Sequence, residues 1–276
     1  MPPPAVIPDE VANVPPFLVE LFSSGEGITK ASQAIGLGAC SLSFYGLNIS
    51  FGNAVPVDLT QMWSQQLVVD LIQCKSSAAI LWAAPPSGTL SRARERPIKR
   101  QWAQAGVPSA PQLRSTSQPE GLSSAMNDKT LASQLEAANK LIYFTFRAVE
   151  TCISEGKPWF IQNPRNSYLW YFPFWSSKNY YDVDFDQCEY GAPRPNPLRI
   201  RSSTDWLASL GARCTNTHTH KPWQPAVLGQ RFMGFPGDEA KGLPPKFAEW
   251  AAAIVQGKYT CFRVNRRHGE GAKDSS

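Results

Sequence analysis

The chain has 276 residues, of which 42% are hydrophobic and 18% charged, enough for one large domain or two small ones with a proper core. A formal charge of +5 permits an anionic partner without requiring nucleic acid. Six cysteines spread over this length lack the density of a secreted disulfide scaffold, and no apolar run reaches the ~18 residues of a membrane span. Residues 1–16 are proline-rich and lack the features of a signal peptide. We therefore expect an intracellular, reduced protein that does not enter a membrane.

Short apolar strands and helices alternate along the first part of the chain. After a loose arm at 1–16, the expected elements are a strand at 17–22, a tight turn at 23–27, a helix at 28–35 ending at Gly36, a strand at 40–45, a helix capped by Asp58 and running to about Cys74, and a strand at 79–83. Such alternation predicts an α/β fold, with a mainly parallel sheet and helices on both faces.

The rest of the chain is less regular. Residues 99–127 lack periodicity, and a loop of this length is typical of an active-site or binding loop. The later elements are expected to be a long helix at 128–155 capped by Asn127 or Asp128, a strand at 158–161 ended by residues 162–164, strands at 180–185 and 198–201, a short helix at 203–210 capped by Ser203, and a helix at 244–256. We expect a core at 17–175, a small irregular segment at 176–243, a helix at 244–258 that completes the core, and a tail at 259–276 whose last part, 266–276, is disordered.

The stretch from Ala79 to Arg96 has the strongest functional pattern. A buried strand stops at Pro85-Pro86, which hold the chain in an extended turn, and Ser87-Gly88 follows. Arginines then occupy alternate positions, at Arg92, Arg94 and Arg96. A strand end that presents a small side chain is where open α/β folds place chemistry, although an ordinary loop leaving a sheet has the same pattern.

Three stretches at strand ends carry a family resemblance: Glu20–Gly27 (ELFSSGEG), Pro85–Gly88 (PPSG) and Gln162–Pro164 (QNP). In this order they resemble the cofactor loop, catalytic turn and Glu-Asn-Pro/Val turn of the cytosine-5 DNA methyltransferases. The resemblance covers about 17–175 and implies a Rossmann-like S-adenosylmethionine-dependent methyltransferase sheet acting on DNA. It implies catalytic roles for Ser87, Gln162, Arg92 and Arg94, and cofactor contacts from Phe22, Ser24, Gly25, Gly27, Asp58 and Pro85.

The sequence departs from this family where the chemistry lies. In the family a cysteine thiolate adds to C6 of a flipped cytosine and a glutamate holds the ring at N3. Here Ser87 takes the nucleophile position, although a hydroxyl needs an adjacent base, and Gln162 takes the glutamate position. Glu26 replaces a cofactor-loop glycine, and the acidic residue expected after the second strand is missing. We expect impaired or lost catalysis, leaving open a divergent enzyme or an inactive nucleic-acid-binding or scaffolding module.

A second set of residues suits a metal. Cys188, Cys214, His218 and His220 form a C-x25-C-x3-H-x-H pattern, and two Cys with two His satisfy the tetrahedral preference of zinc. The spacing is not that of a standard zinc finger, so buried cysteines beside surface histidines are the alternative. A zinc ion here would pin residues 180–225 to the sheet.

Two further features fit nucleic acid or an ordinary fold equally well. The aromatic segment 166–175 (NSYLWYFPFW) either packs on the sheet edge or stacks on bases. Scattered cations either contact phosphates or form a solvated face; they are Arg194, Arg199, Arg201, Arg213 and Lys221. No phosphate loop with Gly-Lys-Ser/Thr is present, which disfavours a plain nucleotide-binding protein. If the protein acts on DNA in a eukaryote, we expect it in the nucleus.

Overall fold

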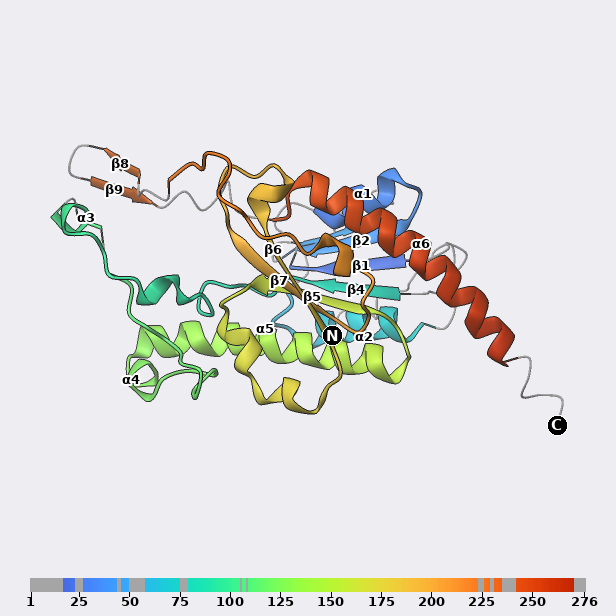
Figure 1. The fold of residues 1–276 in the computed structure, drawn as a ribbon. Coiled ribbons are helices and arrows are strands. Elements are labelled where there is room, and N and C mark those ends of the chain that lie inside the picture. Colours follow the sequence, from blue (N-terminus) through green and yellow to red (C-terminus); the bar gives the residue numbers. More distant parts are fainter. Residues whose placement is uncertain are drawn as a thin grey trace.

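A mixed β-sheet organises the fold. The computed structural model describes residues 17–22, 27–43, 46–49, 58–74, 79–104, 106–107, 109–222, 226–228, 231–234 and 242–270. Within these ranges the main sheet has seven strands in the order β3-β2-β1-β4-β5-β7-β6, and β8 (Ala226–Leu228) and β9 (Arg231–Gly234) form a separate hairpin (Figure 1). The expected arm at 1–16 and the turn residues 23–26 lie outside the described residues.

The centre of the sheet is parallel. β1 (Phe17–Leu21) pairs in parallel with β2 (Gly38–Ser43) and β4 (Ala79–Ala83), and β4 pairs in parallel with β5 (Trp159–Pro164). All five residues of β4 are buried, as expected for an apolar run covered on both faces. The chain leaves β1 toward β2 and returns on the other side at β4. This reversal creates a topological switch point at the carboxyl ends of β1 and β4, where open α/β sheets bind ligands.

Antiparallel strands complete both edges. β3 (Gly46–Ile49) forms a hairpin with β2 at one edge. At the other, β7 (Pro197–Ser202) lies between β5 and β6 (Tyr181–Asp186) and is antiparallel to both. The sheet is therefore mixed rather than mainly parallel as predicted, because parallel and antiparallel strand pairs are equally frequent among its described strands.

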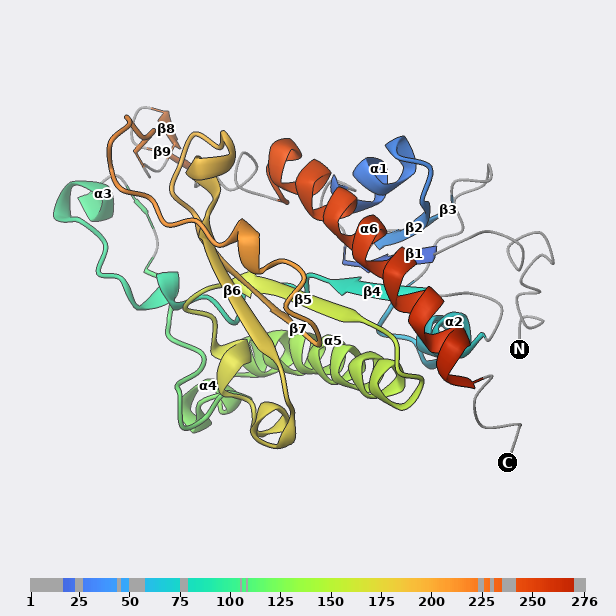
Figure 2. The ribbon, with the colours of Figure 1, turned by 45° about the vertical axis from the view of Figure 1, so that its right-hand side comes forward.

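Helices cover the two faces. α1 (Gly27–Ala34) and α6 (Pro245–Glu270) pack together on one face, and α2 (Met62–Gln73) and α5 (Lys129–Ser154) on the other (Figures 1 and 2). Because successive strand residues point to opposite faces, β4 supplies Ile80 and Trp82 to the α1/α6 core and Leu81 and Ala83 to the α2/α5 core. The predicted α/β architecture with helices on both faces is confirmed.

Helix boundaries follow local hydrogen bonds. Asp128 caps α5 as predicted, accepting the N–H groups of Thr130 and Leu131 at 2.9 Å. Asp58, in contrast, does not cap α2. Its carboxylate bonds Thr60 in a turn, and the helix begins at Met62.

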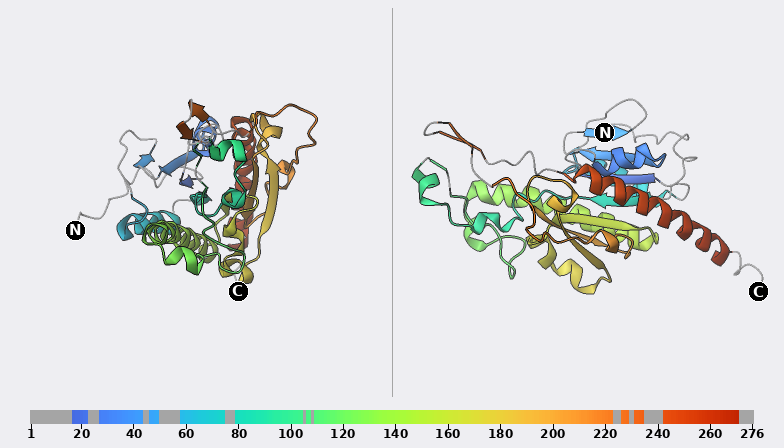
Figure 3. Two further views of the ribbon diagram at one scale, coloured as in Figure 1. Left: turned by 90° about the vertical axis from the view of Figure 1, so that its left-hand side faces the viewer. Right: turned by 45° about the horizontal axis from the view of Figure 1, so that its top comes forward.

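The predicted end of the last helix is also wrong. α6 continues to Glu270, so 259–270 of the predicted tail is helical, including 266–270 of the part expected to be disordered, and the right-hand view of Figure 3 shows the last turns running beyond the sheet. No proline interrupts residues 246–270, and the single interior Gly257 is tolerated at a cost of about 1 kcal/mol. Residues 271–276 lie outside the described part of the chain.

Two boundary errors have one physical cause, pairing with distant residues. Gln162-Asn163-Pro164 does not end β5 but forms its last three residues, because these pair with Ile200, Arg199 and Leu198 of β7. Ser203 does not cap a helix at 203–210; it exchanges hydrogen bonds with the backbone of Trp159. Only a short 3₁₀ turn, η6 (Ala208–Leu210), forms in that range.

The long segment 99–127 contains short helices. α3 (Arg100–Gln104) and α4 (Ser123–Met126) lie within it, and η2 (Arg92–Glu95) precedes it. α3 lies well away from the sheet, on the side where β4 ends and where the β8–β9 hairpin also lies (Figures 1 and 2). Between α3 and α4, the described residues 106–107 and 109–122 form no helix or strand.

Candidate functional site

Buried hydrogen bonds join the ends of three central strands. The N–H of Ala84 donates to the Leu21 carbonyl at 3.1 Å, which links β4 to β1 beyond the last paired residues. The side-chain amide Nδ2 of buried Asn163 donates to the Pro85 carbonyl at 2.8 Å, linking β5 to the Pro-Pro turn. The structure therefore brings together two of the stretches that carry the family resemblance, at the switch point of the sheet.

Ser87 begins a helical turn just after the prolines. Its carbonyl accepts the N–H groups of Leu90 and Ser91 at 3.0 and 2.9 Å. The side chain is half-buried, and its hydroxyl makes no hydrogen bond with any described residue. Nothing in the described part of the chain acts as a base on this hydroxyl, which a serine nucleophile requires.

Gln162 and Asn163 point to opposite faces of the sheet, as successive strand residues must. The Oε1 atom of Gln162 accepts the indole N–H of Trp82 at 3.4 Å, and Trp82 belongs to the α1/α6 core. Gln162 is only 8% exposed. Its amide therefore satisfies a buried indole, a role that an amide fills without a charge or a proton to transfer.

The arginines after the turn have two different roles. Arg94 donates to the carbonyls of Gly88 and Pro111, at 2.9 and 3.4 Å, and so braces the turn from outside. Exposed Arg92 pairs with Glu95 at 3.4 Å and lies over the Tyr168 ring at 5.8 Å. The nearby Glu95 carboxylate raises the pKa of Arg92. Exposed Arg92 thus still faces solvent beside the turn, and Arg94 is committed to backbone carbonyls.

Arg114 is the residue that sequence reasoning missed. Its fully buried guanidinium donates to both oxygens of Thr89 at 2.9–3.1 Å, to the Pro119 carbonyl at 2.5 Å and to the Asn139 side chain at 2.8 Å. Burial lowers its pKa to about 10. These hydrogen bonds link the turn after β4, the long loop and α5 through one side chain. A single arginine in a polar stretch gives no sequence signal of such burial.

The residues that the resemblance assigns to a cofactor are only partly described. Ser24 and Gly25 lie outside the described residues, and Gly27 is the first residue of α1. Phe22 is buried, has a φ of 60°, and packs edge-on against Phe144 at 6.5 Å. A positive φ at a non-glycine residue is strained and frequent next to functional sites.

Two carboxylates lie in this region. Glu20 is buried and accepts the N–H and hydroxyl of Thr29 at 3.0 and 2.6 Å, so it occupies part of the first turn of α1. Asp58 is exposed, and its hydrogen bond from the Thr60 N–H lowers its pKa. Asp58 therefore remains accessible and ionised at neutral pH.

The predicted metal-ligand set comes together in space. Cys188 lies in η5 (Gln187–Tyr190), directly after β6, and the other three lie in the irregular segment after η6. The candidate ligand atoms of Cys188, Cys214, His218 and His220 all lie within 4.8 Å of one another. Cys214 Sγ is 3.4 Å from His220 Nε2 and 3.8 Å from His218 Nε2, and the two Nε2 atoms are 2.9 Å apart.

The two distances from Cys214 Sγ to the imidazoles match a tetrahedral zinc site, whereas the 2.9 Å between the two Nε2 atoms is shorter and would have to open by about 0.4 Å around an ion. Zn–S and Zn–N bonds of about 2.3 and 2.05 Å in a tetrahedron place the ligand atoms about 3.3–3.8 Å apart. Cys214 Sγ also accepts the N–H of Asn216 at 3.3 Å, which suits a thiolate. Burial raises the pKa of the Cys188 thiol to about 12, with the neighbouring Cys214 thiol contributing. A cation stabilises two thiolates and two neutral imidazoles at such close range, which are the metal-binding forms of these side chains.

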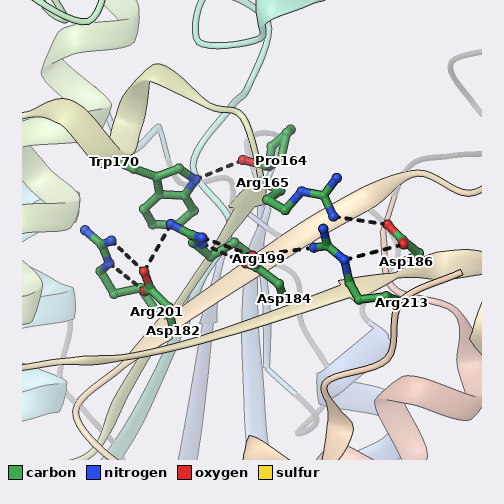
Figure 4. A network of polar contacts seen from close by, with 9 residues as sticks. All are labelled: Pro164, Arg165, Trp170, Asp182, Asp184, Asp186, Arg199, Arg201 and Arg213. Carbon is green, nitrogen blue, oxygen red and sulfur yellow. Dashed lines mark hydrogen bonds and ion pairs between the residues drawn. The ribbon is translucent and has the colours of Figure 1, made fainter.

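A cluster of alternating charges, shown in Figure 4, lies on β6 and β7. Arg201 pairs side-on with Asp182 at 2.8 Å, and Arg199 pairs likewise with Asp184 at 2.7 and 3.0 Å. Arg213 and Arg165 extend the cluster to Asp186, at 3.9 and 3.6 Å. Arg199 and Arg201 are therefore committed to carboxylates rather than free for phosphates, and Arg194 is buried, with its Nε 3.4 Å from the Pro222 carbonyl.

The aromatic segment packs internally, as the first alternative predicted. η3 (Tyr168–Tyr171) and η4 (Pro173–Ser177) bury most of its large side chains against the α2/α5 core. Trp170, Trp175 and Tyr180 surround the Arg201 guanidinium, with ring centres at 5.0, 4.9 and 3.7 Å. These rings hold an arginine of the protein itself, so they are not a free platform for bases.

Comparison with protein-family models, with curated proteins and with solved structures gave no match. Over the described ranges, none of the helices combines the length and apolar character needed to cross a bilayer. Function must therefore be argued from the geometry of the two sites.

Proposed function

We propose that this protein is a cytosine-5 DNA methyltransferase-like protein in which methyl transfer is impaired and the scaffold that faces DNA is retained. The observation that carries this proposal is the buried 2.8 Å bond between Asn163 and the Pro85 carbonyl. This bond joins the Pro-Pro-Ser turn to the Gln-Asn-Pro stretch at the carboxyl ends of β4 and β5, which is the arrangement that the resemblance implies. The strand order from β3 to β5 is compatible with a Rossmann-like methyltransferase sheet.

S-adenosylmethionine is the proposed cofactor, in the crevice outside the carboxyl ends of β1 and β4. Support comes from the switch point itself and from Asp58, whose accessible carboxylate suits the adenine amino group. Phe22 and Pro85 would border the same crevice. An enzyme acting on DNA belongs inside the cell, and in a eukaryote in the nucleus.

Impairment follows from the two side chains at the reaction centre. A thiol ionises near pH ~8.5, whereas a serine hydroxyl needs a base, and none of the described residues bonds the Ser87 hydroxyl. Gln162 is engaged by Trp82 at 3.4 Å and has no acidic proton to share with a cytosine ring. Both departures weaken the same step, addition of the enzyme nucleophile to C6.

The test measures transfer of labelled methyl groups from S-adenosylmethionine to cytosine-containing DNA by the full chain. We expect no turnover by the wild-type protein and measurable turnover by the double variant Ser87→Cys/Gln162→Glu. A matched control carries the new thiol elsewhere, as Ser123→Cys/Gln162→Glu, because Ser123 is exposed on α4. Enzyme-like rates in the wild type would show that catalysis is intact. If the wild type bound neither S-adenosylmethionine nor DNA, the proposal as a whole would be overturned.

An inactive nucleic-acid-binding module is the second candidate, and charge distribution favours it. Between residues 79 and 119 the only acidic residue is Glu95, against six basic ones. Arg96, Lys99 and Arg100 are exposed there, and α3 lies away from the sheet beyond the end of β4 (Figure 1). A basic arm of this kind suits a phosphate backbone.

Salt-dependent DNA binding tests the basic arm, and affinity for S-adenosylmethionine separates the two candidates. The variant Arg96→Ala/Lys99→Ala/Arg100→Ala should weaken binding and lower the slope of log K against log salt by about 2–3. A control with the same charge change on exposed lysines, Lys129→Ala/Lys140→Ala/Lys258→Ala, should leave the slope unchanged. Retained binding without S-adenosylmethionine affinity would favour the module over the impaired enzyme.

We propose, independently, that the Cys/His cluster holds zinc. The support is the donor set of two thiols and two imidazoles, together with distances from Cys214 Sγ to the two imidazoles that are close to those of a tetrahedral site. Metal analysis of the purified protein should give one zinc per chain, and the absence of stoichiometric metal would overturn this second proposal.

A further inference from the structure

Residues 213–222 are held in place in an unusual way. This segment contains neither helix nor strand, but backbone bonds fix it on both sides: the Asp186 N–H donates to Ala212 and the Lys221 N–H to Pro193, each at 2.8 Å. Between these bonds, the side chains that hold the segment to the rest of the protein include Cys214, His218 and His220, which converge with Cys188. We therefore expect the conformation of residues 213–222 to depend on the metal-ligand cluster.

Asp186 joins this cluster to the sheet. One carboxylate oxygen, Oδ2, accepts the backbone N–H of Cys214 at 2.8 Å, which fixes the start of the ligand segment on β6. The other, Oδ1, lies 3.6 Å from Arg165 Nη1. Asp186 is 8% exposed and sits two residues before Cys188, so a single side chain contacts the segments that supply both thiols.

Arg165 connects the same carboxylate to the candidate catalytic region. It directly follows Pro164, the last residue of β5, and its backbone N–H donates to the Pro197 carbonyl at 3.0 Å. Its Nη1 atom is buried and makes no hydrogen bond with the described residues, which leaves the Asp186 carboxylate as its nearby anion. Figure 4 shows both arginines, Arg165 and Arg213, directed at Asp186.

We infer that Asp186 is the positioning residue of the zinc site, and that zinc binding, acting through Asp186, fixes residues 213–222 against β6. This inference rests on the proposed zinc. Four protein donors close the coordination shell, so the ion is structural and has no open position for a substrate. A carboxylate that orients a ligand from outside the shell typically changes metal affinity 10–100-fold when it is removed.

The first experiment measures zinc affinity of the full chain by competition with a chromophoric chelator. Asp186→Asn should bind zinc about 10–100-fold more weakly than the wild type. Asp182→Asn is the matched control, since it lies on the same strand and loses its pairs with Arg199 and Arg201 but does not contact the ligand segment. We expect its zinc affinity to stay within about threefold. Equal losses in both variants would show a general effect of stability and overturn the role of Asp186.

The second experiment measures amide hydrogen exchange before and after zinc is removed. Exchange should accelerate in residues 213–222 and stay unchanged in α5 of the same molecule. Cobalt(II) in place of zinc should give the visible absorption of a tetrahedral S₂N₂ site and restore protection. If the protein holds no metal, the zinc proposal itself fails. If it holds zinc but residues 213–222 exchange equally with and without the metal, the zinc proposal stands and the inference about the segment is wrong.

Discussion

The ends of β4 and β5 and the segment 187–222 differ in what defines them. At the strand ends, backbone topology sets the position: three parallel strands, a Pro-Pro turn and the Asn163 bond leave little freedom. The side chains presented there, Ser87 and Gln162, are chemically weak. Within 187–222, three of the four converging donors lie at 213–222, which contains neither helix nor strand, and all four side chains are strong metal donors.

This contrast shows that the position of a ligand site and the chemistry of the side chains in it are specified separately. A switch point in an α/β sheet identifies where a ligand binds but says nothing of whether a reaction occurs there. A set of thiols and imidazoles, on the other hand, specifies a ligand even where no regular element supports it. The first region is therefore judged by loss or recovery of activity and the second by metal content.

The largest effect is expected from removing a metal donor. Cys214→Ser should lower zinc affinity by more than about 100-fold, because a hydroxyl is a much poorer zinc ligand than a thiolate. Cys74→Ser, a half-buried cysteine outside the cluster, should leave affinity unchanged. Competition with a chromophoric chelator measures both. Equal affinities for the two variants would remove the contrast between the regions.

A comparable test on the other region targets Arg114. Arg114→Met should destabilise the protein by about 2–4 kcal/mol, because the substitution leaves buried oxygens of Thr89, Pro119 and Asn139 without a donor. Arg100→Met on exposed α3 should cost no more than about 0.5 kcal/mol. Urea unfolding measures the difference. If the two variants were equally stable, the turn after β4 would not depend on the hydrogen bonds of Arg114.

A smaller effect is expected in the ion pairs between β6 and β7. Arg201→Lys should cost about 1–2 kcal/mol, because lysine cannot form the two-bond pair with Asp182 or stack flat between the rings. Arg213→Lys should stay within about 0.5 kcal/mol, since Arg213 is half exposed and its contacts are long. Thermal unfolding of both variants provides the comparison, and a larger loss for Arg213→Lys would contradict it.

Thiol reactivity gives the smallest but most direct contrast. Burial raises the pKa of Cys152 to about 12, so its thiolate remains scarce in the folded protein up to about pH 10. We expect Cys152 to resist iodoacetamide at pH 8–9 until the protein unfolds, and Cys214 to react once zinc is removed. Because the unfolded thiol ionises at lower pH than the folded one, this group makes stability fall as pH rises above about 9. Mass spectrometry locates the label, and early modification of Cys152 would show that α5 opens locally.

Local signals account for what the sequence predicted well. β4 is a continuous apolar run, Asp128 is followed by a long helical stripe, and Gly36 has the positive φ of a helix C-terminus. The metal-ligand set was also predictable, because residue type alone restricts its chemistry. Each of these features depends on neighbouring residues or on side-chain identity.

Long-range contacts explain the rest. Gln162 to Pro164 extend β5 because β7, more than thirty residues later, supplies their partners. Arg114 is buried because Thr89 and Asn139 meet around it, and Arg201 lies among rings from three separate turns. No local sequence pattern encodes these long-range contacts, so the burial of Arg114 and the ion pairing of Arg201 could not be predicted.

The outer edge of β6 has a consequence for how this protein behaves at high concentration. Its last residues are covered, because Asp186 donates to Ala212 of the segment that passes η6. Its first half bears Asp182, and a second copy pairing there would bring its own aspartates alongside. A short edge that ends in charge resists strand addition from another molecule. The aspartates of β6 that bind Arg199 and Arg201 thus also make this edge unfavourable for pairing with a second copy.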